Sequence, residues 1–139
     1  MKWHNRFLKL ASEVATWSKD KSTQVGAVIV EDKRIIATGY NGVPACIEDK
    51  EEYYAYPLKE TYIIHAEMNA IFNASKGIRG MTLYCTHTPC ARCAPLLVQA
   101  GITKIITYAR DDSYTLRWSD SIATSKSLFK EANVNYLEI

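Results

Sequence analysis

The residues best suited to chemistry fall into two short segments, His65-Ala66-Glu67 and Pro89-Cys90-Ala91-Arg92-Cys93. The sequence predicts that each segment begins a helix, so Cys90 and Cys93, three residues apart, share one face of a first helical turn. A helix N-terminus favours thiolates, the form of cysteine that binds metals. His65 is a third candidate ligand, and three protein ligands leave the fourth position of tetrahedral Zn²⁺ to water, as in catalytic zinc sites.

Glu67 decides which reaction such a site would perform. It lies two positions after His65 and could reach a metal-bound water without being a ligand itself. Zn²⁺ lowers the pKa of its bound water to about 7, so hydroxide forms at neutral pH, and a neighbouring carboxylate can take up that proton and pass it on. Hydrolytic removal of an amino group requires these events, and H-x-E followed by P-C-x-x-C is the signature of zinc deaminases.

Each part of this constellation has a simpler explanation when it is taken alone. A lone C-x-x-C is also typical of structural zinc sites and redox pairs. His65 alone could be a buried histidine with satisfied hydrogen bonds, and Glu67 alone could complement a helix dipole. A haem attachment would require histidine where Ala94 stands, and a thioredoxin-like pair would leave His65 and Glu67 unexplained. The joint pattern therefore favours catalytic zinc, and a noncatalytic zinc module is the alternative from another class.

The length and composition predict one ordinary folded domain spanning residues 1–139. Hydrophobic residues make up 47% of the chain and charged residues 23%, which is close to average globular usage. The formal net charge of +2 is too small for a general grip on a polyanion, so no nucleic-acid polymer is expected as a partner. No apolar run approaches the roughly 20 residues of a membrane span. Four cysteines are too few for a disulfide scaffold, and we expect a cytoplasmic protein.

Hydrophobic periodicity and turn residues predict the elements that position these groups. Apolar residues at helical spacing indicate a first helix over 3–15, and β-branched runs indicate a hairpin of strands 25–30 and 34–38. The segment from Gly39 to Glu60 is predicted to be a long loop that lines a site. The remaining elements are predicted as helix 65–76, strand 81–85, a helix from Thr88-Pro89 to Ala100, strand 104–108, helix 119–132 and strand 134–139.

The order of these elements predicts the fold class. Strands connected through helices are expected to run parallel, with right-handed crossovers that place helices on the faces of one sheet. The predicted fold is therefore α/β, with three α/β/α layers around a central, mostly parallel five-stranded sheet.

These motifs resemble the cytidine and deoxycytidylate deaminase superfamily, and within it the branch that acts on deoxycytidylate (dCMP). The resemblance covers residues 18–111. The zinc motifs identify the superfamily, and the segment Gly39-Tyr40-Asn41-Gly42-Val43-Pro44 indicates the dCMP branch. The other matching segments are Ser18-Lys19-Asp20, Gln24 to Val30, the rest of the histidine motif from Met68 to Ile71, and Gln99-Ala100-Gly101-Ile102.

The resemblance implies a cytidine-deaminase-like fold and names the residues that carry the reaction. His65, Cys90 and Cys93 would bind one Zn²⁺, and Glu67 would protonate N3 of the cytosine ring while hydroxide adds at C4. Ammonia then leaves, and dCMP becomes dUMP. Other small substrates stay open as alternatives, namely cytidine, deoxycytidine, guanine or a riboflavin precursor. A tRNA adenosine is disfavoured by Gly42-Val43-Pro44, where that branch usually has a different pattern.

Substrate contacts also follow from the resemblance. Asn41 would contact the sugar hydroxyl, and the backbone at Ala66 and Thr88 would help hold the amide edge of cytosine. A free nucleotide carries one phosphate, which needs only a few cations and donors. The candidates for binding that phosphate are Lys19, Lys21, Ser22, Thr23 and Arg110.

Regulation and assembly are implied by the resemblance alone. Allosteric members of the family bind dCTP as an activator and dTTP as an inhibitor near the loop that corresponds to Gly39 to Pro44. Family members are commonly homo-oligomers, either dimers or hexamers built from dimers. A homo-oligomer with possible dCTP and dTTP effectors is therefore expected.

Several residues lie outside these assignments. Some phage relatives carry a second, structural zinc; Cys46, Cys85 and His87 are available here, but Lys19 stands where such a ligand would be expected, so we expect one zinc. Four tyrosines could cover the base, build a subunit interface or pack within the loop: Tyr53, Tyr54, Tyr56 and Tyr62. Three aromatic residues after strand 104–108 are candidates for stacking on the base: Tyr108, Tyr114 and Trp118.

Overall fold

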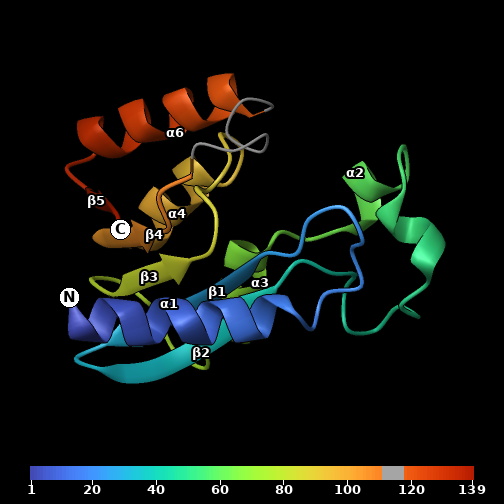
Figure 1. Cartoon of the computed structure of the whole chain (residues 1–139), viewed down its shortest axis with the longest axis horizontal. Coiled ribbons are helices and arrows are strands. Elements are labelled where there is room, and N and C mark those ends of the chain that lie inside the picture. Colours follow the sequence, from blue (N-terminus) through green and yellow to red (C-terminus); the bar gives the residue numbers. More distant parts are fainter. Residues whose placement is uncertain (111–117) are drawn as a thin grey trace.

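The computed structural model describes residues 1–110 and 118–139, and a five-stranded sheet lies between two layers of helices (Figure 1). The strand order is β2-β1-β3-β4-β5. β1 pairs antiparallel with both β2 and β3, whereas β3, β4 and β5 are parallel neighbours. Four strands therefore point the same way and β1 alone is reversed. The strands are β1 (Gly26–Glu31), β2 (Arg34–Tyr40), β3 (Thr82–Cys85), β4 (Lys104–Thr107) and β5 (Asn135–Glu138).

This topology confirms the predicted α/β fold with five strands. The strands connected through helices run in one direction, as crossover connections require. β1 and β2 form the predicted hairpin, and its two turn residues, Asp32 and Lys33, have φ angles of 48° and 65°. Positive φ at both central residues is the geometry of a tight turn whose twist matches the flanking strands.

Helices cover the two faces of the sheet unequally. α1 (Lys2–Ala15) packs on one face through a stripe of apolar side chains, which matches the predicted periodicity. α3 (Ala66–Asn73), α4 (Ala94–Ala100) and α6 (Ser119–Glu131) contribute to the core on the other face. None of the helices in the described ranges is long and apolar enough to cross a membrane. Buried residues of the larger core include Ala27, Ile29, Ala70, Leu83, Leu97, Ile105 and Phe129.

The segment predicted as one long loop from Gly39 to Glu60 contains regular structure. β2 continues to Tyr40, and two short helices follow, η1 (Glu51–Tyr54) and α2 (Lys59–Tyr62). α2 lies at the far end of the molecule from α6 in Figure 1. The prediction missed these helices because each has only four residues, too few to show a helical period.

The two helices that were predicted to carry the candidate ligands are shorter than predicted. α3 begins at Ala66 with His65 as its N-cap, and it ends at Asn73 rather than at residue 76. α4 begins at Ala94, not at Thr88-Pro89, because residues 90–93 first form a turn. The N–H groups of Cys93 and Ala94 donate to the Cys90 carbonyl at 3.1 and 3.0 Å. The cysteines therefore lie on this turn and not in the first turn of the helix.

Gly39 fixes the distance between β2 and α3. A Cβ atom at this position would lie 2.3 Å from the Ala70 nitrogen and 2.5 Å from the Ala66 carbonyl oxygen. Two asparagines of α3, four residues apart, tie the helix to the same strand. Asn69 Nδ2 donates to the Tyr40 carbonyl and Asn73 Nδ2 to the Thr38 carbonyl, both at 2.8 Å. The missing side chain and the two amides together place the N-terminus of α3.

Gly39→Ala is expected to lower the free energy of unfolding by about 1–3 kcal/mol, because the added methyl group meets backbone atoms that cannot rotate away. Urea unfolding followed by circular dichroism measures the change. Gly77→Ala is the matched control, since nothing lies within 4 Å of a Cβ there. Equal unfolding midpoints for the two variants would contradict this account of Gly39.

Candidate active site

The three predicted metal ligands meet beside the carboxyl end of β3. His65 precedes the first turn of α3, and Cys90 and Cys93 lie on the turn between β3 and α4. His65 Nδ1 lies 3.4 Å from Cys90 Sγ and 3.3 Å from Cys93 Sγ. The ligand atoms are all within 4.8 Å of one another, and no other group of this kind occurs in the ranges 1–110 and 118–139.

The donor set and its spacing fit Zn²⁺. Zn–S bonds near 2.3 Å and Zn–N bonds near 2.0–2.1 Å place the ligands of a tetrahedral ion about 3.5–3.8 Å apart. The two Nδ1–Sγ distances are within a few tenths of an ångström of this value. Two cysteines and one histidine are also a typical zinc set, and three ligands leave a fourth position for water or substrate.

The two thiols need a cation before both can ionise. The hydrogen bond with Cys93, followed by that with His65, lowers the pKa of Cys90 to about 4. The same Cys90–Cys93 hydrogen bond, together with burial, raises the pKa of Cys93. The hydrogen bond with Cys90 raises the pKa of His65. The three groups thus share hydrogen bonds at close range, and binding of a divalent cation would release protons from them.

Glu67 lies beside the ligands without joining them. It occupies the first turn of α3, and only 4% of the residue is exposed. Burial raises the pKa of its carboxyl group, and the nearby His65 opposes part of that shift. A buried carboxyl group with a raised pKa is suited to accept a proton and to return it at neutral pH. The geometry therefore agrees with the predicted proton shuttle, which stays a prediction.

Asn41 is 7% exposed, and most of its hydrogen-bonding capacity is already used. Its Nδ2 donates to Asp20 Oδ2 at 3.3 Å and to the Thr23 carbonyl at 2.9 Å. Its Oδ1 accepts the Val25 N–H at 2.9 Å. An amide oxygen has two lone pairs, so the side chain is left with capacity to accept a donor such as a hydroxyl group. Its contact with a sugar hydroxyl remains a prediction.

The two residues predicted to act through their backbone flank the ligands. Ala66 is fully buried and follows His65 directly. Thr88 lies two residues before Cys90, and its hydroxyl is 2.7 Å from the Tyr136 hydroxyl. Thr88 does not cap a helix, because Cys93 is the N-cap of α4. Both positions border the metal ligands, and their contacts with the base stay predictions.

Two of the predicted phosphate-binding residues form ion pairs with an acidic segment. Lys19 Nζ donates to the Asp49 carbonyl at 2.5 Å and lies 4.0 Å from that residue's carboxylate. Lys21 pairs with Glu51, and both side chains are mostly exposed. Exposed ion pairs contribute little to stability, so an anion could displace these carboxylates at small cost.

The other three phosphate candidates divide between two places. The backbone N–H groups of Ser22 and Thr23 donate to Asp20 Oδ1 at 2.8 and 3.1 Å. Arg110 Nε donates to the Thr86 carbonyl at 3.2 Å, just beyond the carboxyl end of β3. Arg110 is thus tied to the segment that leads into the cysteine turn, whereas Ser22 and Thr23 belong to the loop before β1.

Sequence reasoning missed the ion pair between Asp20 and Lys59. Lys59 Nζ lies 2.7 Å from Asp20 Oδ2, and the aspartate side chain is 2% exposed. The pair connects α2 to the loop that also holds Asn41. The sequence carried a local signal for Asp20 alone, because an aspartate followed by small polar residues is typical of a turn in which the aspartate side chain accepts the next backbone N–H groups. Nothing local indicates Lys59.

The tyrosines of the 53–62 segment have different environments. Tyr53 and Tyr62 stack with ring centroids 4.2 Å apart. Tyr54 is buried and donates from its hydroxyl to Asp49 Oδ1 at 2.7 Å, and burial raises its pKa. Tyr56 is 63% exposed. Tyr54 therefore packs within the loop, and the exposed ring of Tyr56 is the one that suits a ligand or a partner.

The remaining candidates are spread over the structure. Tyr108 packs with the α1 core, and Ser12 of that helix donates to its hydroxyl at 3.3 Å. Trp118 directly precedes α6, and Tyr114 lies outside the described residues. Cys46 is exposed, whereas Cys85 is buried at the end of β3, where burial raises its pKa.

Comparisons with known proteins match this site. Residues 1–109 match the family model for the "Cytidine and deoxycytidylate deaminase zinc-binding region", which confirms the predicted zinc cofactor. The chain is 38% identical over 133 residues to an "Uncharacterized deaminase in luxG 3'region" of Aliivibrio fischeri, covering 96% of this chain and 90% of the relative. It is 36% identical over 144 residues to the deoxycytidylate deaminase of Mus musculus, covering 98% and 79%. The dCMP deaminase of cyanophage S-TIM5, solved in complex with dCMP and dUMP, superposes with a TM-score of 0.76 at 28% identity, covering 97% and 95%.

Cys90→Ala is expected to lose most of the bound zinc, because two ligands no longer compensate the cost of removing the ion from water. Metal analysis of the purified protein after gel filtration measures the zinc-to-protein ratio. Cys46→Ser removes an exposed thiol far from the ligand group in sequence and should retain the parent's zinc. A Cys90→Ala protein with the parent's zinc content would disprove this ligand.

Proposed function

Because the chain belongs to the cytidine and deoxycytidylate deaminase family, we propose that this zinc-dependent deaminase hydrolyses dCMP to dUMP and ammonia. The observation that carries the reaction type is the buried carboxyl of Glu67 beside the His65, Cys90 and Cys93 ligand group. The substrate is supported by the relatives, since the mouse protein is a deoxycytidylate deaminase and the cyanophage enzyme was solved with dCMP and dUMP.

Glu67 moves the protons of the proposed reaction. When bound, Zn²⁺ lowers the pKa of a water at its open position and so supplies hydroxide at neutral pH. Glu67 accepts the proton that this water loses and donates it to N3 of cytosine, which makes C4 electrophilic. The hydroxyl oxygen adds to C4, and the new C4 hydroxyl passes its proton to the amino group through the same carboxyl. The C4–N4 bond then breaks as the C4=O bond forms. One water is consumed, and dCMP is converted to dUMP and ammonia.

Residues around the zinc ligands would orient the nucleotide. The Asn41 side chain, fixed by Asp20, Thr23 and Val25, presents its remaining acceptor capacity to a sugar hydroxyl. The backbone at Ala66 and Thr88 holds the amide edge of the base. The phosphate is bound among the cations and donors already named: Lys19, Lys21, Ser22, Thr23 and Arg110.

Assembly, regulation and compartment complete the proposal. We treat residues 1–139 as one deaminase domain that forms a homo-oligomer, with dCTP as activator and dTTP as inhibitor near Gly39 to Pro44. The resemblance of that segment to the dCMP branch supports the effectors. The four free cysteines support a reducing compartment, the cytoplasm.

Steady-state assays of the purified zinc protein against dCMP, deoxycytidine, CMP and guanine test the substrate. We expect a higher kcat/KM for dCMP than for deoxycytidine or guanine, because dCMP carries a phosphate that engages the phosphate-binding residues. CMP carries the same phosphate, so the comparison of dCMP with CMP tests recognition of the sugar. Adding dCTP or dTTP to the dCMP assay tests regulation in the same experiment. A higher kcat/KM for deoxycytidine than for dCMP would rule out the nucleotide specificity.

Glu67→Gln is expected to lower kcat by on the order of 10²-fold or more, because the amide cannot exchange a proton with substrate. The variant keeps the size of the side chain and all three zinc ligands. Zinc content and the circular dichroism spectrum should therefore equal those of the parent. Turnover close to the parent's, at equal zinc content, would refute the role of Glu67.

A further inference from the structure

Two hydrogen bonds reach the cysteine turn from the end of the chain, beyond residue 109, where the family match stops. Ser121, in the first turn of α6, accepts the Ala91 N–H at 2.8 Å through Oγ. Tyr136, in β5, places its hydroxyl 2.7 Å from Thr88 Oγ1. Ala91 directly follows Cys90 and Thr88 precedes it by two residues. The two contacts therefore hold the backbone after one metal ligand and a side chain shortly before it.

The Ser121 contact supplies a partner to a backbone group that the turn leaves free. Cys93 and Ala94 donate their N–H groups to the Cys90 carbonyl, and Leu97 donates to Cys93. Like the first N–H groups of any helix, the Ala91 N–H has no backbone carbonyl within the turn to which it can donate. The Ser121 hydroxyl is partly buried and takes this place. Its loss would leave Ala91 without a protein partner and free the turn to rotate.

The Tyr136 contact is part of a wider network that orients the phenol. The ring stacks on Phe129 with centroids 5.8 Å apart, and the residue is half-buried. The hydroxyl donates to Glu138 Oε1 at 3.2 Å, and Lys126 pairs with the same carboxylate at 2.6 Å. The Thr107 hydroxyl also lies 3.0 Å from the phenol oxygen, so three groups fix the position of the phenol hydroxyl. The phenol is thus a fixed hydrogen-bond partner for Thr88.

We propose that Ser121 and Tyr136 are positioning residues that hold the turn Thr88–Cys93 in the geometry that zinc requires. Neither residue belongs to the ligand group. They act through Ala91 and Thr88 on the direction of the Cys90 thiol, and so on its distance to His65 Nδ1. The proposal depends on the zinc site and not on the choice of dCMP as substrate.

The test measures zinc affinity by competition with a chromophoric chelator. We expect Ser121→Ala to weaken zinc binding by about 10–100-fold, the usual effect of losing a partner that orients a ligand. Tyr136→Phe, which removes only the hydroxyl, should weaken it in the same direction by a smaller factor. Ser121→Thr, which keeps the hydroxyl, should restore most of the affinity.

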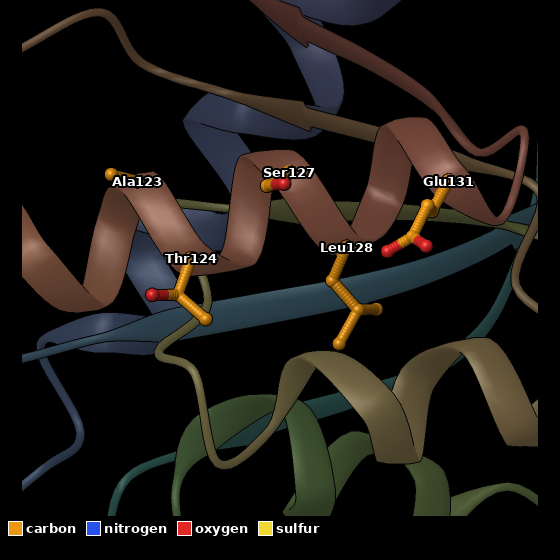
Figure 2. A pocket seen from close by; sticks show the side chains of 5 residues that line it. All are labelled: Ala123, Thr124, Ser127, Leu128 and Glu131. Atoms are coloured by element: carbon orange, nitrogen blue, oxygen red, sulfur yellow. The ribbon is translucent and has the colours of Figure 1, made fainter.

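Ser127→Ala is the matched control on the same helix. Ser127 is exposed, and Figure 2 shows its side chain with Ala123, Thr124, Leu128 and Glu131 around a surface depression of α6. No hydrogen bond joins it to Thr88–Cys93 in the described ranges. Its zinc affinity should equal that of the parent.

Urea unfolding of the zinc-free proteins separates positioning from general loss of structure. The proposal requires weaker zinc binding in variants whose zinc-free unfolding midpoints stay near the parent's. If Ser121→Ala does not fold, Tyr136→Phe and Ser121→Thr still decide the matter. Affinities within twofold of the parent for Ser121→Ala and Tyr136→Phe, or an equal loss in Ser127→Ala, would overturn the proposal. If the two variants bind zinc weakly and the parent deaminates a substrate other than dCMP, the positioning role stands. Only the substrate assignment is then refuted.

Discussion

Two thiols and an imidazole must meet within 4.8 Å although His65 and Cys90 are 25 residues apart, and much of the structure serves this contact. Thiolates side by side repel each other, and a bound cation would compensate this repulsion. The backbone must bring the start of α3 and the turn before α4 to one point beforehand. Gly39 does this for α3, because its lack of a side chain lets the helix approach β2.

A second polar centre lies around Asp20 and includes the Asn41 side chain. Asp20 is nearly completely buried and accepts hydrogen bonds from two backbone amides, the Asn41 side chain and Lys59. A buried carboxylate is stable only when it is paired and fully hydrogen-bonded, so these contacts depend on one another. Removing Lys59 would leave a charge in the interior and release the loop that holds Asn41. The short helix α2 is therefore tied to Asn41 through the Lys59–Asp20 ion pair.

Local patterns predicted the five strands, the longer helices and the metal ligands, whereas long-range contacts remained hidden. The strands follow from β-branched runs, and the ligands follow from spacings of two and three residues. The start of α4 was wrong because Thr88 uses its hydroxyl for Tyr136, 48 residues away, and not for a helix cap. The Asp20–Lys59 pair and the Ala91–Ser121 hydrogen bond also join distant segments. No periodicity or turn chemistry in one sequence specifies which distant polar groups will meet.

The reversed direction of β1 has a consequence for which parts of the chain reach the site. In a sheet whose strands all ran one way, the segment entering the first strand would lie at the edge remote from the other carboxyl ends. Here Gly26 pairs with Tyr40, and its carbonyl accepts the Thr86 N–H, so the amino end of β1 lies among those carboxyl ends. Because β1 is inverted, the loop of residues 18–25, which leads into the sheet, lies beside segments that follow the carboxyl ends of other strands.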